Sequence, residues 1–288
     1  MKRHLLIASC VLLGLTSGCG SDGSAPDPGV RTEDAEAVDM DNLRIRVSGR
    51  AAVLPEAARL LESRGQPVPS LDGVPVTIEE PLRVAVNDVN ATFGSSALSA
   101  NGDFSVDEVA VREVHLSLAA GLSAPGFVRT ATVVYDTAFS GARPRTDLID
   151  ARVWALPEAF HDALGAAVGE SRVRGHTGDK AATLRDAGFV LGRVVDANGR
   201  PVAGARVAPD RSELAERIYY PTADFSGVGQ EGTGADGLFL YVHTGADAET
   251  FRLSVEGAQD YVPRNAGAAP GWGLMLTVYP GNHPPPEP

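Results

Sequence analysis

Short apolar runs, each bounded by turn-forming residues, recur along most of the chain. In the last third, residues 251–256 alternate between apolar and polar as a half-buried strand does, and residues 273–279 form an apolar run typical of a buried strand. Residues 233–240 combine a turn with another apolar strand, and Asn198-Gly199 separates two runs rich in β-branched residues. Because this dipeptide favours a type I′ turn, it predicts a β-hairpin over residues 189–207.

The same order of landmarks occurs earlier in the chain. The earlier landmarks are the segments 45–53, 65–68, 73–76, 101–104, 114–119 and 130–135. Among the matches, GQPV at 65–68 corresponds to GRPV at 199–202, and TATVVY at 130–135 corresponds to MLTVY near the end. An internal repeat of short strands predicts a mainly β protein with two β-sandwich domains, at 42–137 and 188–280.

Two segments break the strand pattern. Residues 54–64 carry apolar positions at helical spacing between Pro55 and Gly65, which predicts a short helix inserted in the first sandwich. Residues 138–187 form a connecting segment, in which a strand at 148–156 precedes an amphipathic helix with Phe160, Leu164 and Val168 on one face. The polar end of this segment, 175–186, predicts a loop. Whether the segment belongs to the first sandwich or bridges both is left open by the pattern.

The second copy resembles a known family. Residues 192–207 fit the pattern G-x-V-x-D-x-x-G-x-P-V-x-G-A-x-V of the carboxypeptidase regulatory-like domain, and Asp236–Phe239 fits its later D-G-x-F step. The resemblance implies a transthyretin-like β-sandwich of about seven strands. It does not imply peptidase activity, because the domain is an accessory module and no histidine here is followed by Glu three places later.

The N-terminus has the pattern of an export signal. Lys2 and Arg3 precede the apolar run Leu5–Leu15, which is shorter than the roughly 20 residues that a membrane-spanning helix needs. Small residues lead to Cys19 and resemble the lipobox of bacterial lipoproteins. Residues 1–18 are therefore predicted to be a signal peptide and Cys19 the site of lipid attachment, which would anchor the chain in a membrane.

The segments flanking the sandwiches are polar. Residues 19–41 contain many acids and few large apolar side chains, which predicts a flexible tether whose root-mean-square reach is about 25 Å. Residues 281–288 form a Pro-rich tail that is predicted to be extended. In the lipoprotein sorting rule, aspartate after the lipidated cysteine favours the inner membrane, so glycine at position 20 predicts the outer membrane.

Charge and cysteine content restrict the chemistry. Removing Lys2 and Arg3 with the signal peptide takes the formal net charge from −12 to −14, and an acidic surface of this kind disfavours nucleic acid as a partner. The two cysteines are Cys10, inside the signal peptide, and Cys19. An acylated Cys19 leaves no free thiol, which excludes thiol catalysis and Cys-ligated metal from the prediction.

No residue pattern specifies a catalytic, metal or cofactor site, and none is predicted. The six histidines, at 4, 115, 161, 176, 243 and 283, lack metal-binding spacing. Residues 227–232 spell G-x-G-x-x-G but run toward another turn and strand, so they predict a loop rather than a nucleotide site. The acidic and amide residues Asp196, Asn198, Asp236 and Asp247 are spaced as turn residues rather than as a calcium loop.

One segment has features that favour a binding surface. The long connection 208–232 carries Tyr219, Tyr220 and Phe225, and long loops on a sandwich often bind partners. The alternative is that these rings cover the edge of the sandwich or the neighbouring domain. Trp154 and Trp272 are expected to pack in the core or between the domains.

These observations predict a non-enzymatic surface lipoprotein whose sandwiches act as a structural or binding module. Its expected partners are the membrane, reached through the lipid, and an envelope protein, a peptide or a glycan. Two alternatives remain: an accessory subunit of an envelope secretion or uptake complex, and a hydrolase with an unrecognised site.

Overall fold

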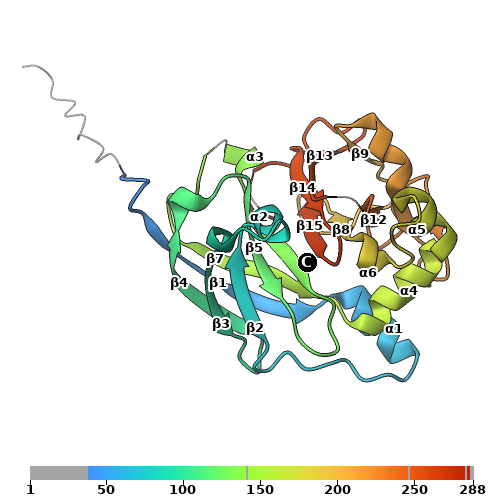
Figure 1. Cartoon of the computed structure of the whole chain (residues 1–288), viewed down its shortest axis with the longest axis horizontal. Coiled ribbons are helices and arrows are strands. Elements are labelled where there is room, and N and C mark those ends of the chain that lie inside the picture. Colours follow the sequence, from blue (N-terminus) through green and yellow to red (C-terminus); the bar gives the residue numbers. More distant parts are fainter. Residues whose placement is uncertain (1–37, 141, 246, 283, 286–288) are drawn as a thin grey trace, which may run out of the picture. The chain divides into compact units, whose positions relative to one another are not determined.

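The structure, a computed structural model, describes residues 38–140, 142–245, 247–282 and 284–285 (Figure 1). The signal peptide, Cys19 and most of the expected tether lie outside the described residues. A compact unit begins at Val38, close to the expected end of the tether at Asp41. The described part of this unit is mainly β, as the strand pattern predicts.

The first half forms a sandwich of two layers. One layer has the order β4 (Asp103–Ala110), β1 (Arg44–Val53) and β7 (Leu148–Ala155). The other has the order β3 (Thr92–Ala97), β2 (Pro75–Glu79), β5 (Ser117–Leu122) and β6 (Thr130–Asp136). Side chains from both layers, among them Val47, Ile78 and Leu118, fill the core between them.

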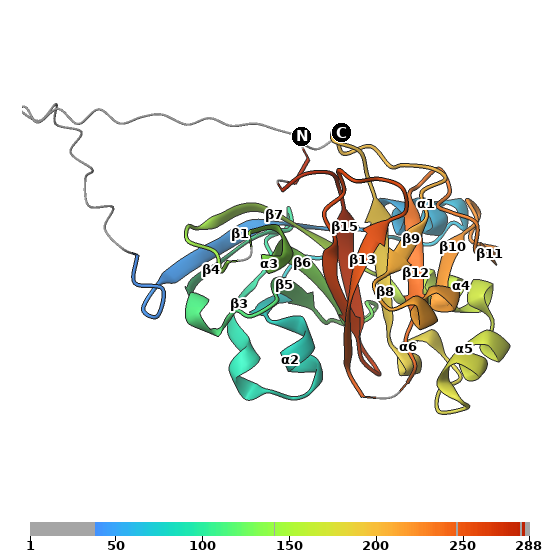
Figure 2. The same cartoon turned by 90° about the horizontal axis from the view of Figure 1, so that it is seen from above.

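The second half repeats this architecture (Figure 2). One layer has the order β11 (Val228–Gly229), β10 (Ile218–Pro221), β12 (Leu238–Val242), β8 (Phe189–Val194) and β15 (Gly273–Val278). The other has the order β14 (Arg264–Ala268), β13 (Glu249–Val255) and β9 (Val207–Pro209). Phe239, Leu253 and Trp272 belong to the core between the layers, which confirms the expectation that Trp272 packs inside.

The pairings make the two sandwiches equivalent strand by strand. β1 pairs antiparallel with β4 and parallel with β7, just as β8 pairs antiparallel with β12 and parallel with β15. The run β2-β5-β6 likewise matches β9-β13-β14. The counterpart of β15 is therefore β7, not the segment 130–135, so that landmark match is wrong. The strand of the connecting segment completes the first sandwich, which extends to Ala155, past the expected boundary at 137.

The two sandwiches share a sheet. β6 of the first pairs in parallel with β15 of the second, through Thr130–Gly273, Ala131–Leu274 and Thr132–Met275. This pairing joins one layer of each sandwich into a single sheet that runs from β11 to β3. The halves are therefore connected by main-chain hydrogen bonds as well as by the chain itself.

Helices cover the outer face of the β8 and β12 layer (Figure 1). They are α1 (Pro55–Ser63), α4 (Glu158–Val168), α5 (Glu170–Thr177) and α6 (Leu184–Ala187). The helix at 54–64 and the apolar face of Phe160, Leu164 and Val168 are confirmed, since these three side chains are fully buried. The prediction of a loop at 175–186 is wrong at both ends, because α5 extends to Thr177 and α6 begins at Leu184. The buried side chains of Val173 and Leu184 hold these two helices against the core.

The turn at Asn198-Gly199 differs from the predicted hairpin. Only Gly199 has positive φ, at 79°, whereas a type I′ turn needs it at both central residues. The Asp196 side chain accepts the N–H of Asn198 at 2.8 Å and of Arg200 at 2.9 Å, so an Asx turn shapes this loop. After the single bridge Val195–Pro201, the chain crosses to the other layer, where it forms β9.

The remaining short helices lie at strand ends. They are α2 (Pro81–Ala85), α3 (Thr137–Ser140) and the 3₁₀ turns Val89–Ala91, Val111–Glu113 and Ser212–Arg217. α2 contacts β5 of the first sandwich and β14 of the second, so it lies at the junction of the two halves.

Candidate functional site

The residues singled out by the sequence fall in two places. Cys19, the predicted lipid attachment site, lies outside the described residues, so its acylation stays a prediction. Tyr219, Tyr220 and Phe225 lie in the second sandwich, where their relative exposures are 5%, 5% and 6%.

This burial corrects the prediction that the three rings form a partner-binding loop. Tyr219 and Tyr220 are in strand β10, and successive side chains of a strand point to opposite faces. Tyr219 joins the core beneath the helices together with Phe225, whereas Tyr220 joins the core between the layers. The layer is covered on both faces, so neither direction leads to solvent. The sequence predicted the helix that carries Phe160, Leu164 and Val168, but no local pattern shows that this helix packs on β10, about 50 residues later.

Both tyrosine hydroxyls are used inside the protein. The Tyr219 hydroxyl lies 2.6 Å from Nε2 of His176 on α5, and the Tyr220 hydroxyl accepts the N–H of Val207 at 2.8 Å. Burial raises the pKa of both phenols, so they stay protonated at neutral pH. The rings therefore fasten a helix and a neighbouring strand to β10.

A first polar junction links β6 to β14. The carboxylate of Asp136, which is 3% exposed, accepts the main-chain N–H of Asn265 at 2.8 Å and its side-chain amide at 2.6 Å. It also accepts the N–H of Ala138 at 2.8 Å. Burial raises the pKa of Asp136 despite these bonds and the nearby positive charge of Arg264. We call this group the Asp136 junction.

Arg264 completes the Asp136 junction from β14. Its guanidinium lies 3.9 Å from the ring centre of Tyr279 and donates to the Tyr279 carbonyl at 2.7 Å. Burial lowers its pKa to about 10, while the charge of Asp136 acts in the opposite direction. A buried cation of this kind is stabilised by its partners, so the junction joins the first sandwich to the second through charge and hydrogen bonds.

A second polar junction links the inserted helix to the second sandwich. Glu56 of α1 is 2% exposed and forms an ion pair with Arg193 of β8. Arg59, one helical turn later, pairs with Asp236 at 2.6 Å. The Arg193 guanidinium also lies over the Trp154 ring, 5.8 Å from its centre. We call this group the α1 junction, and it confirms that Trp154 packs between the sandwiches.

A third polar group lies inside the second sandwich. Glu249 of β13 accepts the Tyr241 hydroxyl, and its Oε1 lies 3.6 Å from Nε2 of His243. His243 is fully buried, and its Nδ1 lies 2.9 Å from the Ala187 carbonyl. Burial lowers the pKa of His243 and raises that of Tyr241. The histidine therefore connects α6 to the sheet through groups that solvent does not reach.

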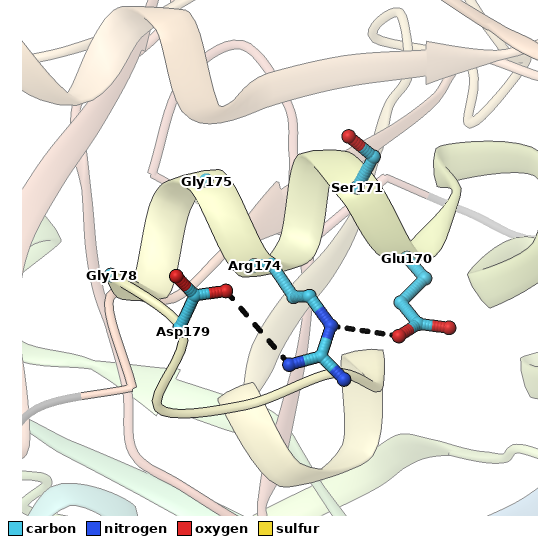
Figure 3. Close-up of a pocket in the computed structure, with 6 residues that line it drawn as sticks. All are labelled: Glu170, Ser171, Arg174, Gly175, Gly178 and Asp179. Carbon is cyan, nitrogen blue, oxygen red and sulfur yellow. Dashed lines mark hydrogen bonds and ion pairs between the residues drawn. The ribbon is translucent and has the colours of Figure 1, made fainter.

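One open depression of about 660 Å³ lies beside α5 (Figure 3). Arg174 points across it toward Glu170, at 2.7 Å, and Asp179, at 3.9 Å. Ser171 points away from these charges. The arginine is already paired with two carboxylates, and all three charged side chains are largely exposed, so the depression has the character of a solvated helix surface.

Other predicted features behave as turns and surface segments. Residues 227–232 include β11 and lead toward β12 rather than into a helix, as expected for a loop. Asp196 shapes its turn, and Asp236 pairs with Arg59.

Within the described ranges, no three histidine, cysteine or acidic side chains are grouped to hold a metal ion. In the same part of the chain, no helix has the length and apolar character that crossing a membrane requires.

Comparison with known proteins gives no family. No protein-family model matches the chain, and no curated protein matches it. Among solved structures, the Bacillus anthracis TIE protein is similar over 84% of this chain and 34% of its own length, with 9% identity and a TM-score of 0.23. A streptococcal ancillary pilin is similar over 84% and 70%, with 10% identity and a TM-score of 0.20.

A further similar structure is the shaft pilin SpaA from Lactobacillus rhamnosus GG. It covers 84% of this chain and 99% of its own, with 9% identity and a TM-score of 0.19. The chain spans about a third of the length of the TIE protein. The description of the fold as paired β-sandwiches therefore rests on the strand pairings of the chain itself.

Proposed function

We propose that the chain is an exported, lipid-anchored envelope protein whose double β-sandwich acts as a non-enzymatic structural or binding module. The observation that carries the proposal is the order of parts along the chain. A signal-like segment ends at Cys19, an acidic polar stretch follows, and a compact unit begins at Val38. Such an order suits a folded body held a short distance from a membrane.

The use of the buried ionisable groups supports the non-enzymatic part of the proposal. Asp136 and Glu56 bond to groups of the other sandwich, whereas Arg264 and His243 bond within the second one. These side chains join strands and helices to one another. The buried polar groups therefore have structural roles, and those of Asp136 and Glu56 connect the two halves.

The finer parts of the proposal extend the sequence prediction. We infer that each half is a transthyretin-like sandwich related to the carboxypeptidase regulatory-like domain, that the lipid lies in the outer membrane, and that the partner is an envelope protein, a peptide or a glycan. The first half has seven strands, which agrees with the strand number of that sandwich, and six of them have equivalents in the second half.

Metabolic labelling with an alkyne palmitate analogue tests the anchor. The wild-type protein should carry the label and sediment with the outer membrane, whereas Cys19→Ala should carry none and leave the membrane fraction or accumulate as a precursor. An unlabelled wild-type protein would contradict the proposal.

Cross-linking in intact cells tests the module. Lys180 is the only lysine outside the predicted signal peptide, so amine-reactive reagents have a single side chain to attack. A photo-crosslinking residue placed on exposed strand positions, such as Arg50 or Thr250, avoids this restriction. A defined envelope protein, peptide or glycan recovered with the wild type but not with Cys19→Ala would support a binding module. Turnover of peptide, ester or glycan substrates by the purified protein would refute the non-enzymatic role.

A further inference from the structure

Glu79, at the end of β2, is a largely buried acidic side chain. It is 5% exposed, yet among the residues the structure describes none donates a hydrogen bond to it or forms an ion pair with it. Glu56 and Glu80 are buried to the same degree, and both are paired. Burying a charge without a partner is costly, so an unpaired buried carboxyl calls for a physical explanation.

The carboxyl group of Glu79 lies against a glycine on the neighbouring strand. A Cβ atom built on Gly121 of β5 would lie 2.9 Å from Oε1 of Glu79 and 3.1 Å from Oε2. The carboxyl group therefore lies flat against the main chain, in space that any other residue at position 121 would fill. Burial raises the pKa of Glu79 to about 7, and the charge of Arg129 opposes this rise.

Few charges face Glu79 from the elements packed around it. Strands β3 and β5 carry no charged residue, and β2 carries none besides Glu79. On α2, Arg83 is engaged by Glu80 at 3.3 Å and Asp88 at 2.9 Å. The charged residues at β6 and β14 are Asp136 and Arg264, which belong to the Asp136 junction, and Arg129 just before β6. Among these groups, Arg129 is the one whose charge lowers the pKa of Glu79.

Helix α2 connects this carboxyl to the second sandwich. The helix starts at Pro81, two residues after Glu79, and contacts both β5 and β14. Its Leu82 side chain occupies the space above Gly267 of β14, where a Cβ atom would overlap it. A displacement of Glu79 therefore moves the start of the helix that covers β14.

We propose that Glu79 is a proton-controlled clamp on α2 at the junction of the two sandwiches. With its proton, the carboxyl is neutral and stays seated on Gly121, and α2 stays closed over β14. Without the proton, the carboxylate favours water, and α2 with Leu82 opens from β14. The clamp is closed in mildly acidic solution and loosened in mildly alkaline solution, and it does not depend on the proposed anchor.

Amide hydrogen exchange of the full-length protein tests the clamp. Protection factors, corrected for the intrinsic pH dependence of exchange, are measured for peptides covering α2 and β14 at about pH 5.5 and about pH 8.5. If opening returns Glu79 from a pKa of about 7 to its ordinary 4.5, protection should fall about 30-fold between these conditions. Segments that exchange by local opening while Glu79 stays buried, such as the surface helix α5, should not show this fall.

Two variants separate the clamp from a general effect of pH. Glu79→Gln keeps the size of the side chain but carries no charge, and it should retain protection at both conditions. Glu62→Gln changes an exposed glutamate of α1 and should behave as the wild type does. Equal protection of α2 and β14 in the wild type at both conditions, or a fall that persists in Glu79→Gln, would overturn the proposal.

Discussion

The Asp136 junction should contribute several kcal/mol to the free energy of unfolding. Asp136→Ala removes an acceptor of three short hydrogen bonds and leaves the N–H of Asn265 without its partner. It also removes the carboxylate that acts on the buried guanidinium of Arg264. A buried donor left without its acceptor costs about 1–3 kcal/mol, so with three hydrogen bonds lost we expect a decrease of several kcal/mol.

Urea unfolding of the full-length protein measures this loss. The matched control is Asp103→Ala, which removes the partner of Arg50 in an ion pair of 2.8 Å whose side chains are 50% and 67% exposed. An exposed pair contributes less than about 1 kcal/mol, so the control should change stability little. If Asp136→Ala cost no more than Asp103→Ala, the reasoning about the junction would be refuted.

The remaining predictions concern the α1 junction, two glycines and pH. Glu56→Ala should lower stability by about 3 kcal/mol in urea unfolding, because it leaves a largely buried arginine of β8 unpaired. Gly192→Ala should lower stability by about 1–3 kcal/mol in a thermal melt, since its Cβ would overlap the Phe239 ring. Gly175→Ala, in an open position of α5, should instead raise stability by about 0.5–1 kcal/mol. The unfolding free energy should fall by about 3 kcal/mol as pH rises from about 4.5 to 7, because folded Glu79 holds its proton while the unfolded chain releases it; Glu79→Gln should abolish this part of the pH profile.

Each of these results has an outcome that would contradict it. A Glu56→Ala loss below 1 kcal/mol would mean that Arg193 does not depend on its partner. Similar melting temperatures for Gly192→Ala and Gly175→Ala would mean that the packing around Phe239 is loose. A Glu79→Gln profile with the wild-type slope would assign the pH dependence to other groups.

Local patterns in the sequence predicted the elements that depend on local interactions. The helix at 54–64 follows from its Pro55 start and apolar spacing, and the apolar face of α4 follows from Phe160, Leu164 and Val168. The repeat and the mainly β fold also follow from the strand and turn pattern. Each helix, strand and turn is determined within about a dozen residues, and the repeat follows from comparing these elements along the chain.

Features that depend on distant partners could not be predicted. Nothing near Tyr219 or Tyr220 shows that helices cover one face of β10 and another layer covers the other. The hairpin failed for a similar reason, because the strand after Gly199 finds its partner in β13, about 50 residues later. The parallel pairing of β6 with β15 and the seat of Glu79 on Gly121 likewise join distant segments.

The central claim is that the two sandwiches form one continuous body through their shared sheet. Differential scanning calorimetry of the full-length protein tests it directly, by comparing the calorimetric enthalpy of unfolding with the van 't Hoff enthalpy. We predict one transition with equal enthalpies, because separating β6 from β15 and opening both polar junctions must accompany unfolding of either half. Two transitions, or a calorimetric enthalpy about twice the van 't Hoff value, would show that the sandwiches unfold independently and would contradict the account.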